Sequence, residues 1–343
     1  MSQEHQRNET AVLIISFLTT LGLVCGGAFL WFKNSRIVSQ NGSTQQIQST
    51  GTQFTSVTNV PTGLFNYGGS TTWATIRRDI DSVIQKELPQ FRLRYTDPTT
   101  GAPGSSPGIK MVINGQLSFS QSSRQIKAEE QKEALKLGFM LEQIPVAIDG
   151  IAIAVHPGLK IPGLTVAQLK DIYTGKINNW QQVGGPNLPI TPYSRRLEDG
   201  GTIEFFYDNV LNKQNFGANV QYVSTTTDGL RQLERNEGGI YYASAPEVVG
   251  QCEIRPLPIG RQASEFIAPY KEPLIERSKC PSERNQINID AFKTDKYPIT
   301  RRLFVIVKQN KQSDQEAGIA YANLLLTEQG QELISKTGFV RIK

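Results

Sequence analysis

Histidine and cysteine are scarce in this 343-residue chain, which contains two histidines and three cysteines. Beyond the first forty residues the single histidine is His156, so a histidine-based proton relay or a multi-histidine metal site is hard to assemble. No P-loop for nucleotide phosphates is present either. Asp149, a candidate catalytic acid, is more simply interpreted as part of a hinge turn. We therefore expect a binding protein rather than an enzyme, with no cofactor and no metal.

The charge of the chain has no strong bias and no long block of one sign. Its 36 lysines and arginines against 31 aspartates and glutamates give a net charge of +5, which is weak beside the basic patches of nucleic-acid-binding domains. With 38% hydrophobic residues, 30 glycines and 18 prolines, the composition excludes a disordered, collagen-like or coiled-coil chain. The sequence predicts a folded protein that binds no nucleic acid and tolerates an anionic ligand.

A long apolar run without charge lies near the N-terminus. Residues 11–32 carry no charged side chain, and at 1.5 Å per residue they make about 33 Å of helix, enough to cross a bilayer core. We expect residues 1–36 to form a transmembrane anchor and the polar residues 37–60 to form a flexible tether. A cleaved signal peptide and lipidation at Cys25 are the alternatives. By the positive-inside rule alone, the flanking charges would keep the rest of the chain in the cytoplasm.

Beyond residue 60, short apolar runs alternate with segments of helical period. Residues 64–67 and 91–95 predict strands on either side of a helix over 72–88, which makes a βαβ unit. The alternation continues to the C-terminus, except over 260–297, where weak periodicity predicts a long irregular excursion. This pattern is typical of an α/β fold with two sets of strands. Further strands are expected at 117–119, 144–155, 190–193, 221–223, 239–243 and 300–307, and further helices at 107–114, 128–137, 202–210, 228–235, 314–325 and 328–336, with one more opened by Thr165.

Two cysteines lie in this α/β part, Cys252 and Cys280. An even pair in a chain that begins with a membrane-crossing segment suits an oxidising compartment, so we expect a disulfide between them. Two unrelated buried thiols are the alternative.

Three clusters rich in glycine and hydroxyl side chains each lie between a strand and a helix. They cover residues 68–72, 104–108 and 196–202. A helix N-terminus offers free N–H groups and a partial positive charge, and glycine lets a ligand approach the backbone. Arg124 and the pair Arg195 and Arg196 could add forked donors to a tetrahedral anion. Each cluster alone is more typical of helix capping than of ligand binding, but together they predict an oxyanion site.

Several longer motifs accompany these clusters, and the most specific is LKDIYTGKINNW at 169–180. The others are GST at 69–71, GSSPGIK at 104–110, GQLSFSQSSR at 115–124, DGIAIAV at 149–155, Arg196 followed by Gly201 and Thr202, and the pairing of GQ at 330–331 with GFV at 338–340. With these motifs, the chain from about residue 64 onward resembles the PstS family, the phosphate-binding proteins of bacterial phosphate ABC transporters.

The resemblance implies the periplasmic binding protein fold, with two α/β lobes joined by a strand hinge. Lobe one would comprise residues 61–148 and 298–343, and lobe two residues 149–297. The globular part would lie on the periplasmic side of the cytoplasmic membrane, against the simple charge count, since large domains translocate despite such flanking charges. The partners implied are inorganic phosphate and the ABC permease, with the chain acting as a monomeric receptor.

The resemblance also implies which residues bind phosphate in the cleft. They are Ser70, Thr71, Ser105, Ser106, Ser123, Arg124, Arg196, Gly200, Gly201 and Thr202. Two positions depart from the family pattern: Ser123 and Arg124 stand where some members have an aspartate, and Gly200 stands where members usually have serine. Because a carboxylate accepts the proton of hydrogen phosphate and repels sulfate, the first departure leaves selectivity for phosphate over sulfate open.

Two alternative functions are compatible with the same cleft. A membrane-anchored sensor or scavenger of phosphate, or of oxyanions in general, would bind its ligand in the same way without feeding a transporter. An extracytoplasmic phosphatase-like hydrolase would need an activated nucleophile or a metal, and the sequence shows neither.

Overall fold

The computed structural model describes residues 51–197 and 200–342. The predicted transmembrane anchor over 1–36 and residues 37–50 of the predicted tether lie outside these ranges. Within them, every helix is too short or too polar to cross a membrane.

The last part of the predicted tether is ordered, which corrects the prediction of a flexible segment reaching residue 60. A 3₁₀ turn, η1 (Phe54–Ser56), places Phe54 in a fully buried position. The backbone N–H of Phe54 donates to Gln329 Oε1 at 2.8 Å. Phe54 is the one large apolar residue in a polar stretch, and its burial holds the surrounding segment against the body of the protein.

Parallel and antiparallel strands form the sheet of the N-terminal half. β1 (Gly63–Gly69) pairs in parallel with β2 (Phe91–Tyr95) and β3 (Phe119–Ser122). β11 (Thr300–Gln309), from the end of the chain, pairs antiparallel with β3 and with β4 (Met140–Val155). The predicted βαβ unit is therefore confirmed, and the last strand returns to complete the first sheet.

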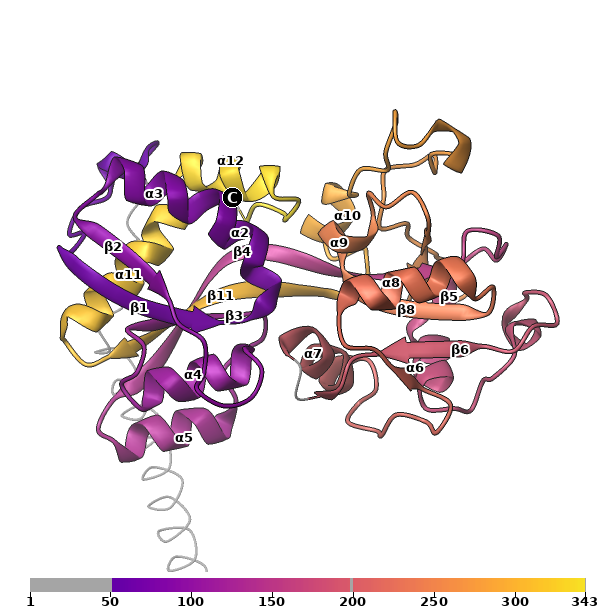
Figure 1. Cartoon of the computed structure of the whole chain (residues 1–343), viewed down its shortest axis with the longest axis horizontal. Helices are drawn as coiled ribbons and strands as arrows, with labels where there is room; N and C mark the ends of the chain where they lie inside the picture. The colour runs from indigo at the N-terminus through magenta and orange to yellow at the C-terminus, as the bar shows by residue number, and fades with distance from the viewer. Residues whose placement is uncertain (1–50, 198–199, 343) are drawn as a thin grey trace, which may run out of the picture. The chain divides into compact units, whose positions relative to one another are not determined.

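Helices cover both faces of this sheet (Figure 1). α4 (Ser105–Ile113) and α5 (Ala128–Lys136) lie on one face, and α11 (Ser313–Leu326) and α12 (Glu328–Lys336) lie with the first helical segment on the other. That segment consists of η2 (Thr71–Trp73), α2 (Ala74–Ile76), the π-helical turn η3 (Arg77–Asp81) and α3 (Ser82–Glu87). The apolar core lies between residues 54 and 147 and between 303 and 339, and the part of the chain packed around it is called lobe one.

A second core lies between residues 151 and 299, with Val340 added, and the part packed around it is called lobe two. Its strands are β5 (Leu164–Thr165), β6 (Thr191–Ser194), β7 (Gln221–Tyr222), β8 (Gly239–Ser244), β9 (Arg255–Leu257) and β10 (Ile259–Gly260). Its helical elements are α6 (Val166–Tyr173), η4 (Trp180–Val183), α7 (Gly201–Asn209), α8 (Thr226–Arg235), α9 (Ala245–Val248), η6 (Arg277–Lys279) and α10 (Ile289–Lys293).

The strand β4 passes from one lobe to the other. Its first part pairs with β11 from Met140 to Gly150, and its last part, from Ile151 to Val155, pairs with β8. The run of apolar residues that predicted a strand over 144–155 therefore serves both cores, because each half of the strand is buried in a different lobe. This confirms the two-lobe α/β fold and the strand connection expected from the sequence.

Most predicted elements are present, with boundaries that shift by a few residues. The helix expected over 107–114 begins at Ser105, and the strand expected over 117–119 runs from Phe119 to Ser122. The helix expected over 72–88 forms but contains the π-helical turn. Asp149, expected at a hinge turn, lies inside the continuous strand β4.

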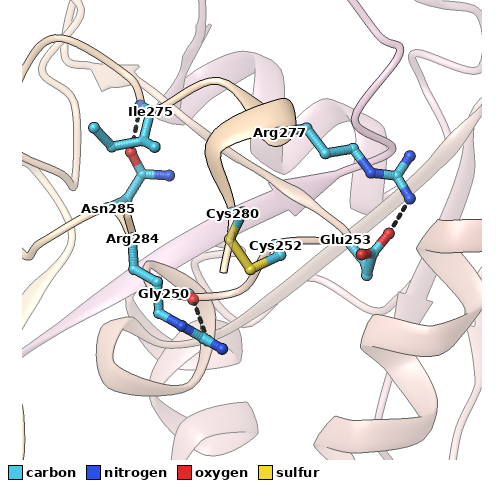
Figure 2. The surroundings of a disulfide bond; sticks show 8 residues. All are labelled: Gly250, Cys252, Glu253, Ile275, Arg277, Cys280, Arg284 and Asn285. Atoms are coloured by element: carbon cyan, nitrogen blue, oxygen red, sulfur yellow. Dashed lines mark hydrogen bonds and ion pairs between the residues drawn. A yellow bond between two sulfur atoms is a disulfide. The ribbon is translucent and has the colours of Figure 1, made fainter. Parts of the chain in front are cut away.

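The structure joins Cys252 and Cys280 by a disulfide, with Cα atoms 5.7 Å apart, as predicted (Figure 2). The bond closes the segment that contains β9, β10 and η6. Neighbouring contacts brace the same region: Arg284 donates to the carbonyl oxygen of Gly250 at 3.0 Å, and the N–H of Ile275 donates to Asn285 Oδ1 at 2.8 Å. The disulfide therefore constrains part of the irregular segment over 260–297, where short helices and strands supply few backbone hydrogen bonds.

Removing this disulfide is expected to destabilise the protein. In a chain-entropy treatment, a cross-link between residues 28 apart stabilises by about 3–4 kcal/mol. The variant with both Cys252→Ser and Cys280→Ser should lose roughly this free energy of unfolding in urea titrations. Wild-type protein in reductant is the matched comparison, and equal unfolding midpoints for the variant and the oxidised wild type would contradict the prediction.

Candidate functional site

The first turn of α4 lies among hydroxyl groups from two other segments. Ser105 Oγ accepts a hydrogen bond from the backbone N–H of Ser123 at 3.1 Å, and the two hydroxyl oxygens are 3.2 Å apart. Ser70 Oγ donates to Ser123 Oγ at 2.9 Å. All three side chains are fully buried. Three serines that are distant in sequence thus form one hydroxyl cluster at the end of the sheet of lobe one.

The N-terminus of α7 brings lobe two to this hydroxyl cluster. A Cβ added to Gly201 would lie 2.2 Å from Ser123 Oγ and 2.5 Å from Ser105 Oγ, so only a glycine backbone fits there without displacement. The preceding residue, Gly200, has a φ of 135°, which L-amino acids rarely adopt. This conformation gives a physical reason for glycine where the family resemblance implies serine. The N-termini of α4 and α7 meet at one point, where their N–H groups and dipoles favour an anion.

A cavity of about 220 Å³ lies between the two lobes at the same level. Thr71 and Thr72 line it from lobe one, and Thr202 lines it from α7. The Oγ1 atoms of Thr72 and Thr202 are 3.2 Å apart, so the lobes are in contact here. Thr75 Oγ1, from the same wall, has no hydrogen-bond partner within the described residues. The cavity therefore presents hydroxyl groups that can donate to an oxyanion.

Arg195, rather than Arg196, lines this cavity. The side chain of Arg196 is exposed, and its guanidinium carbon lies 5.2 Å from the ring centroid of Tyr222. Because neighbouring residues at the end of a strand point in opposite directions, only one of the two arginines that follow β6 can face the cleft. The sequence predicted Arg196 as a phosphate ligand, whereas the arginine that lines this cavity is Arg195.

Ser106 and Arg124, two more of the predicted ligands, hold a carboxylate of lobe two. Arg124 Nε donates to Glu204 Oε2 at 2.6 Å, and Ser106 Oγ donates to the same oxygen at 3.0 Å. Both Nη atoms of Arg124 also bind Glu130, at 3.0 and 2.6 Å. Although burial acts to raise it, the guanidinium of Arg124 holds the pKa of Glu204 below its usual value. These contacts brace the two lobes. Thr71 and Thr202 are the predicted ligands that line the cavity, and the other predicted ligands, Ser106 and Arg124 among them, do not line it.

One arginine that contacts the site was not predicted from the sequence. Arg301, at the start of β11, is 5% exposed and donates from Nε and Nη2 to Asp149 Oδ2, at 3.0 and 2.8 Å. Its Nη2 also lies 3.1 Å from Thr72 Oγ1 and 2.9 Å from Thr202 Oγ1, and its Nη1 donates to the carbonyl of Gly201 at 3.2 Å. Arg301, which lies in β11, therefore contacts β4 through Asp149. It also contacts Thr72 of lobe one and Thr202 of lobe two.

A buried network supports the hydroxyl cluster from below. Arg77 Nη1 donates to the carbonyl of Ser70 at 3.0 Å and to Gln121 Oε1 at 3.1 Å. Gln121 Nε2 donates to the hydroxyl of Tyr321, which in turn donates to Asp81 Oδ1, both at 2.8 Å. Burial raises the pKa of Asp81 to about 6. The π-helical turn carries both Arg77 and Asp81, and so anchors the segment that presents Ser70.

The sequence of this chain is similar to those of known binding proteins. A family model described as a PBP superfamily domain matches residues 46–329. The phosphate-binding protein PstS of Borreliella burgdorferi is 28% identical over 290 residues, which cover 82% of this chain and 90% of the relative. PstS of Staphylococcus epidermidis is 26% identical over 269 residues, covering 77% of this chain and 74% of the relative.

Solved structures share the same fold. A crystal structure from Clostridium perfringens, assigned to a phosphate ABC transporter substrate-binding protein with bound phosphate, superposes with a TM-score of 0.63 at 23% identity and covers 82% of this chain and all of that one. A phosphate transport receptor from Vibrio cholerae has a TM-score of 0.62 at 18% identity, with coverage of 80% and 99%. The resemblance predicted from the sequence motifs is confirmed.

Proposed function

Because the chain belongs to the PBP superfamily, we propose that it captures inorganic phosphate between its two lobes and delivers it to an ABC transporter. The observation that carries the proposal is the meeting of the α4 and α7 N-termini beside a cavity lined by threonine hydroxyls and a guanidinium. The relatives named as phosphate-binding proteins support the same ligand. In this role the chain binds and releases phosphate without chemical change.

Phosphate would be held by groups from both lobes. From lobe one, Ser70, Thr71, Ser105 and Ser123 would supply hydroxyls. From lobe two, Gly200 and Gly201 would supply backbone N–H groups, and Thr202 would supply its hydroxyl. Arg195 would balance the negative charge, because a guanidinium in a partly dry cleft binds an oxyanion with strong hydrogen bonds. Since the two sets of groups lie on different lobes, bound phosphate would hold the lobes closed, and separation of the lobes would release it.

The surroundings of this receptor are proposed from the resemblance and the sequence. We propose the boundaries that the resemblance implies, with residues 61–148 and 298–343 in lobe one and 149–297 in lobe two, and with the segment around Phe54 packed onto lobe one. The globular part would lie on the periplasmic side, held by the anchor within residues 1–36, and would present phosphate to a membrane permease as a monomer.

Calorimetric titration of the full chain with phosphate, and separately with sulfate, tests this proposal. Wild-type protein is expected to bind phosphate, and Arg195→Ala is expected to weaken phosphate binding by about 10- to 150-fold, since it removes charge-assisted hydrogen bonds of about 1.5–3 kcal/mol. Absence of phosphate binding by the wild type would contradict the proposed function.

Arg196→Ala is the matched control, because it removes the same side chain one residue further along. Its exposed position predicts less than a threefold change in phosphate affinity. If Arg196→Ala abolished binding while Arg195→Ala did not, the assignment of the arginine would be wrong and the choice made from the sequence would be correct.

A further inference from the structure

A second hollow, of about 620 Å³, is lined by residues of both lobes and is called the hinge groove here. It is larger than the threonine-lined cavity of about 220 Å³, and none of the proposed phosphate ligands lines it. β11 contributes Thr300 and Arg302 to its wall, and α7 contributes Phe205 and Asp208. Binding sites for small organic ligands have volumes of about 300–1,000 Å³, so the hinge groove has the size of such a site.

Four apolar side chains line the hinge groove, two from each lobe. Ile126 and Phe304 belong to the core of lobe one or pack against it, and Ile148 and Phe205 pack against the core of lobe two. Ile126, Ile148 and Phe205 are partly exposed to solvent. A ligand with a flat ring could cover this apolar surface and gain the free energy of hydrophobic burial.

The cations of the hinge groove fall into two groups. Arg124, Lys127 and Arg301 each form an ion pair with a carboxylate that does not line the groove. The other cations are exposed and form no ion pair with another described residue, and they are Lys213, Lys293 and Arg302. These three side chains can donate hydrogen bonds to an anionic group of a ligand.

Two carboxylates also line the hinge groove. Asp295 accepts a hydrogen bond from Thr300 Oγ1 at 3.1 Å, and Asp208 is partly buried and forms no ion pair with another described residue. Ionised carboxylates repel a bare polyanion but accept hydrogen bonds from hydroxyl and amino groups. The groove therefore favours a ligand that combines one anionic group with hydrogen-bond donors and a ring.

We infer that the hinge groove is a second ligand site, which takes a nucleotide. The phosphate of a nucleoside monophosphate would bind the free cations, its ribose hydroxyls or base amino group would donate to Asp208 and Asp295, and its base would cover the apolar side chains. The inference goes beyond the proposed function, because it concerns a separate site and a different ligand.

Calorimetric titration of the full chain with adenosine monophosphate, in the presence of excess phosphate, tests the inference. Excess phosphate occupies the threonine-lined cavity, so the remaining binding reports on the hinge groove. The wild type is expected to bind adenosine monophosphate at one site, and to bind adenosine and pyrophosphate at least tenfold more weakly, because each lacks one of the matching parts. The variant with both Lys213→Gln and Lys293→Gln should bind adenosine monophosphate at least tenfold more weakly than the wild type, since charge-assisted hydrogen bonds are lost. Its phosphate affinity should change less than threefold.

The variant with both Lys86→Gln and Lys271→Gln is the matched control, because it removes two exposed lysines outside the hinge groove. It should bind adenosine monophosphate like the wild type, and thermal melting checks that all three proteins are folded.

A wild type that binds phosphate but no adenosine monophosphate would overturn the inference while the proposed function stands. Equal nucleotide affinity in the Lys213 and Lys293 variant and the wild type would overturn it as well. A chain that dimerises and binds no nucleotide would show that a second copy covers the groove, which also contradicts the inference. A wild type that binds adenosine monophosphate in the groove but no phosphate would overturn only the proposed function.

Discussion

Replacing Arg301 with alanine is expected to lower the free energy of unfolding by about 3–5 kcal/mol, because it leaves the buried carboxylate of Asp149 without its charged partner. The side chains of this ion pair are 1% and 0% exposed, so water cannot replace the guanidinium. Phosphate affinity should also fall at least tenfold, since the same guanidinium bonds the hydroxyls of Thr72 and Thr202. Urea unfolding and calorimetry measure the two effects.

The adjacent Arg302 offers a control for this prediction. It is exposed and makes no ion pair within the described residues, so Arg302→Ala should change the free energy of unfolding by less than about 0.5 kcal/mol. A double variant, Arg301→Met with Asp149→Asn, should recover at least half of the loss, because no unpaired buried charge remains. If Arg301→Ala were as stable as Arg302→Ala, the ion pair would have no structural importance.

Replacing Gly201 with alanine is expected to reduce phosphate affinity at least a hundredfold while each lobe stays folded. The added methyl group would lie 2.2 Å from Ser123 Oγ and 2.5 Å from Ser105 Oγ, where lobe two touches the hydroxyl cluster of lobe one. The α7 N-terminus would have to move away from the hydroxyls, and the groups that should hold the anion would separate. Calorimetry gives the affinity, and circular dichroism checks that the secondary structure is retained.

Gly250→Ala makes the same chemical change at a position with room for it. There the nearest atom to an added Cβ is the carbonyl oxygen of Asn285 at 3.9 Å. This variant should bind phosphate like the wild type. Unchanged affinity in Gly201→Ala would show that close approach of α7 to the hydroxyl cluster is not required for binding.

The fold could be predicted well because its signals are local. The period of apolar residues located the strands and helices, and Thr165 does cap α6 by accepting from the N–H of Gln168 at 3.0 Å. The long apolar run predicted the strand β4, and the structure divides this strand between the two lobes. The prediction of a flexible tether was wrong at its C-terminal end, because one buried residue, Phe54, orders a stretch whose average composition is polar.

The site could be predicted in part. Glycine and hydroxyl clusters before helices are visible in a sequence, and the structure brings Ser70, Ser105, Ser123 and Gly201 together. The direction in which an arginine points is set by tertiary packing. The sequence alone therefore could not show that Arg195, and not Arg196, lines the cavity. No short-range pattern reveals partners such as Arg301 and Asp149, which are 152 residues apart.

The most direct test of the account is a crystal structure of the protein grown with arsenate, whose anomalous scattering locates a phosphate-like oxyanion without ambiguity. The account predicts one strong peak between the lobes, within hydrogen-bond distance of Thr71, Thr202 and Arg195. A cleft without a peak, or a peak only at another surface, would contradict the claim that the meeting of the α4 and α7 N-termini forms the phosphate site.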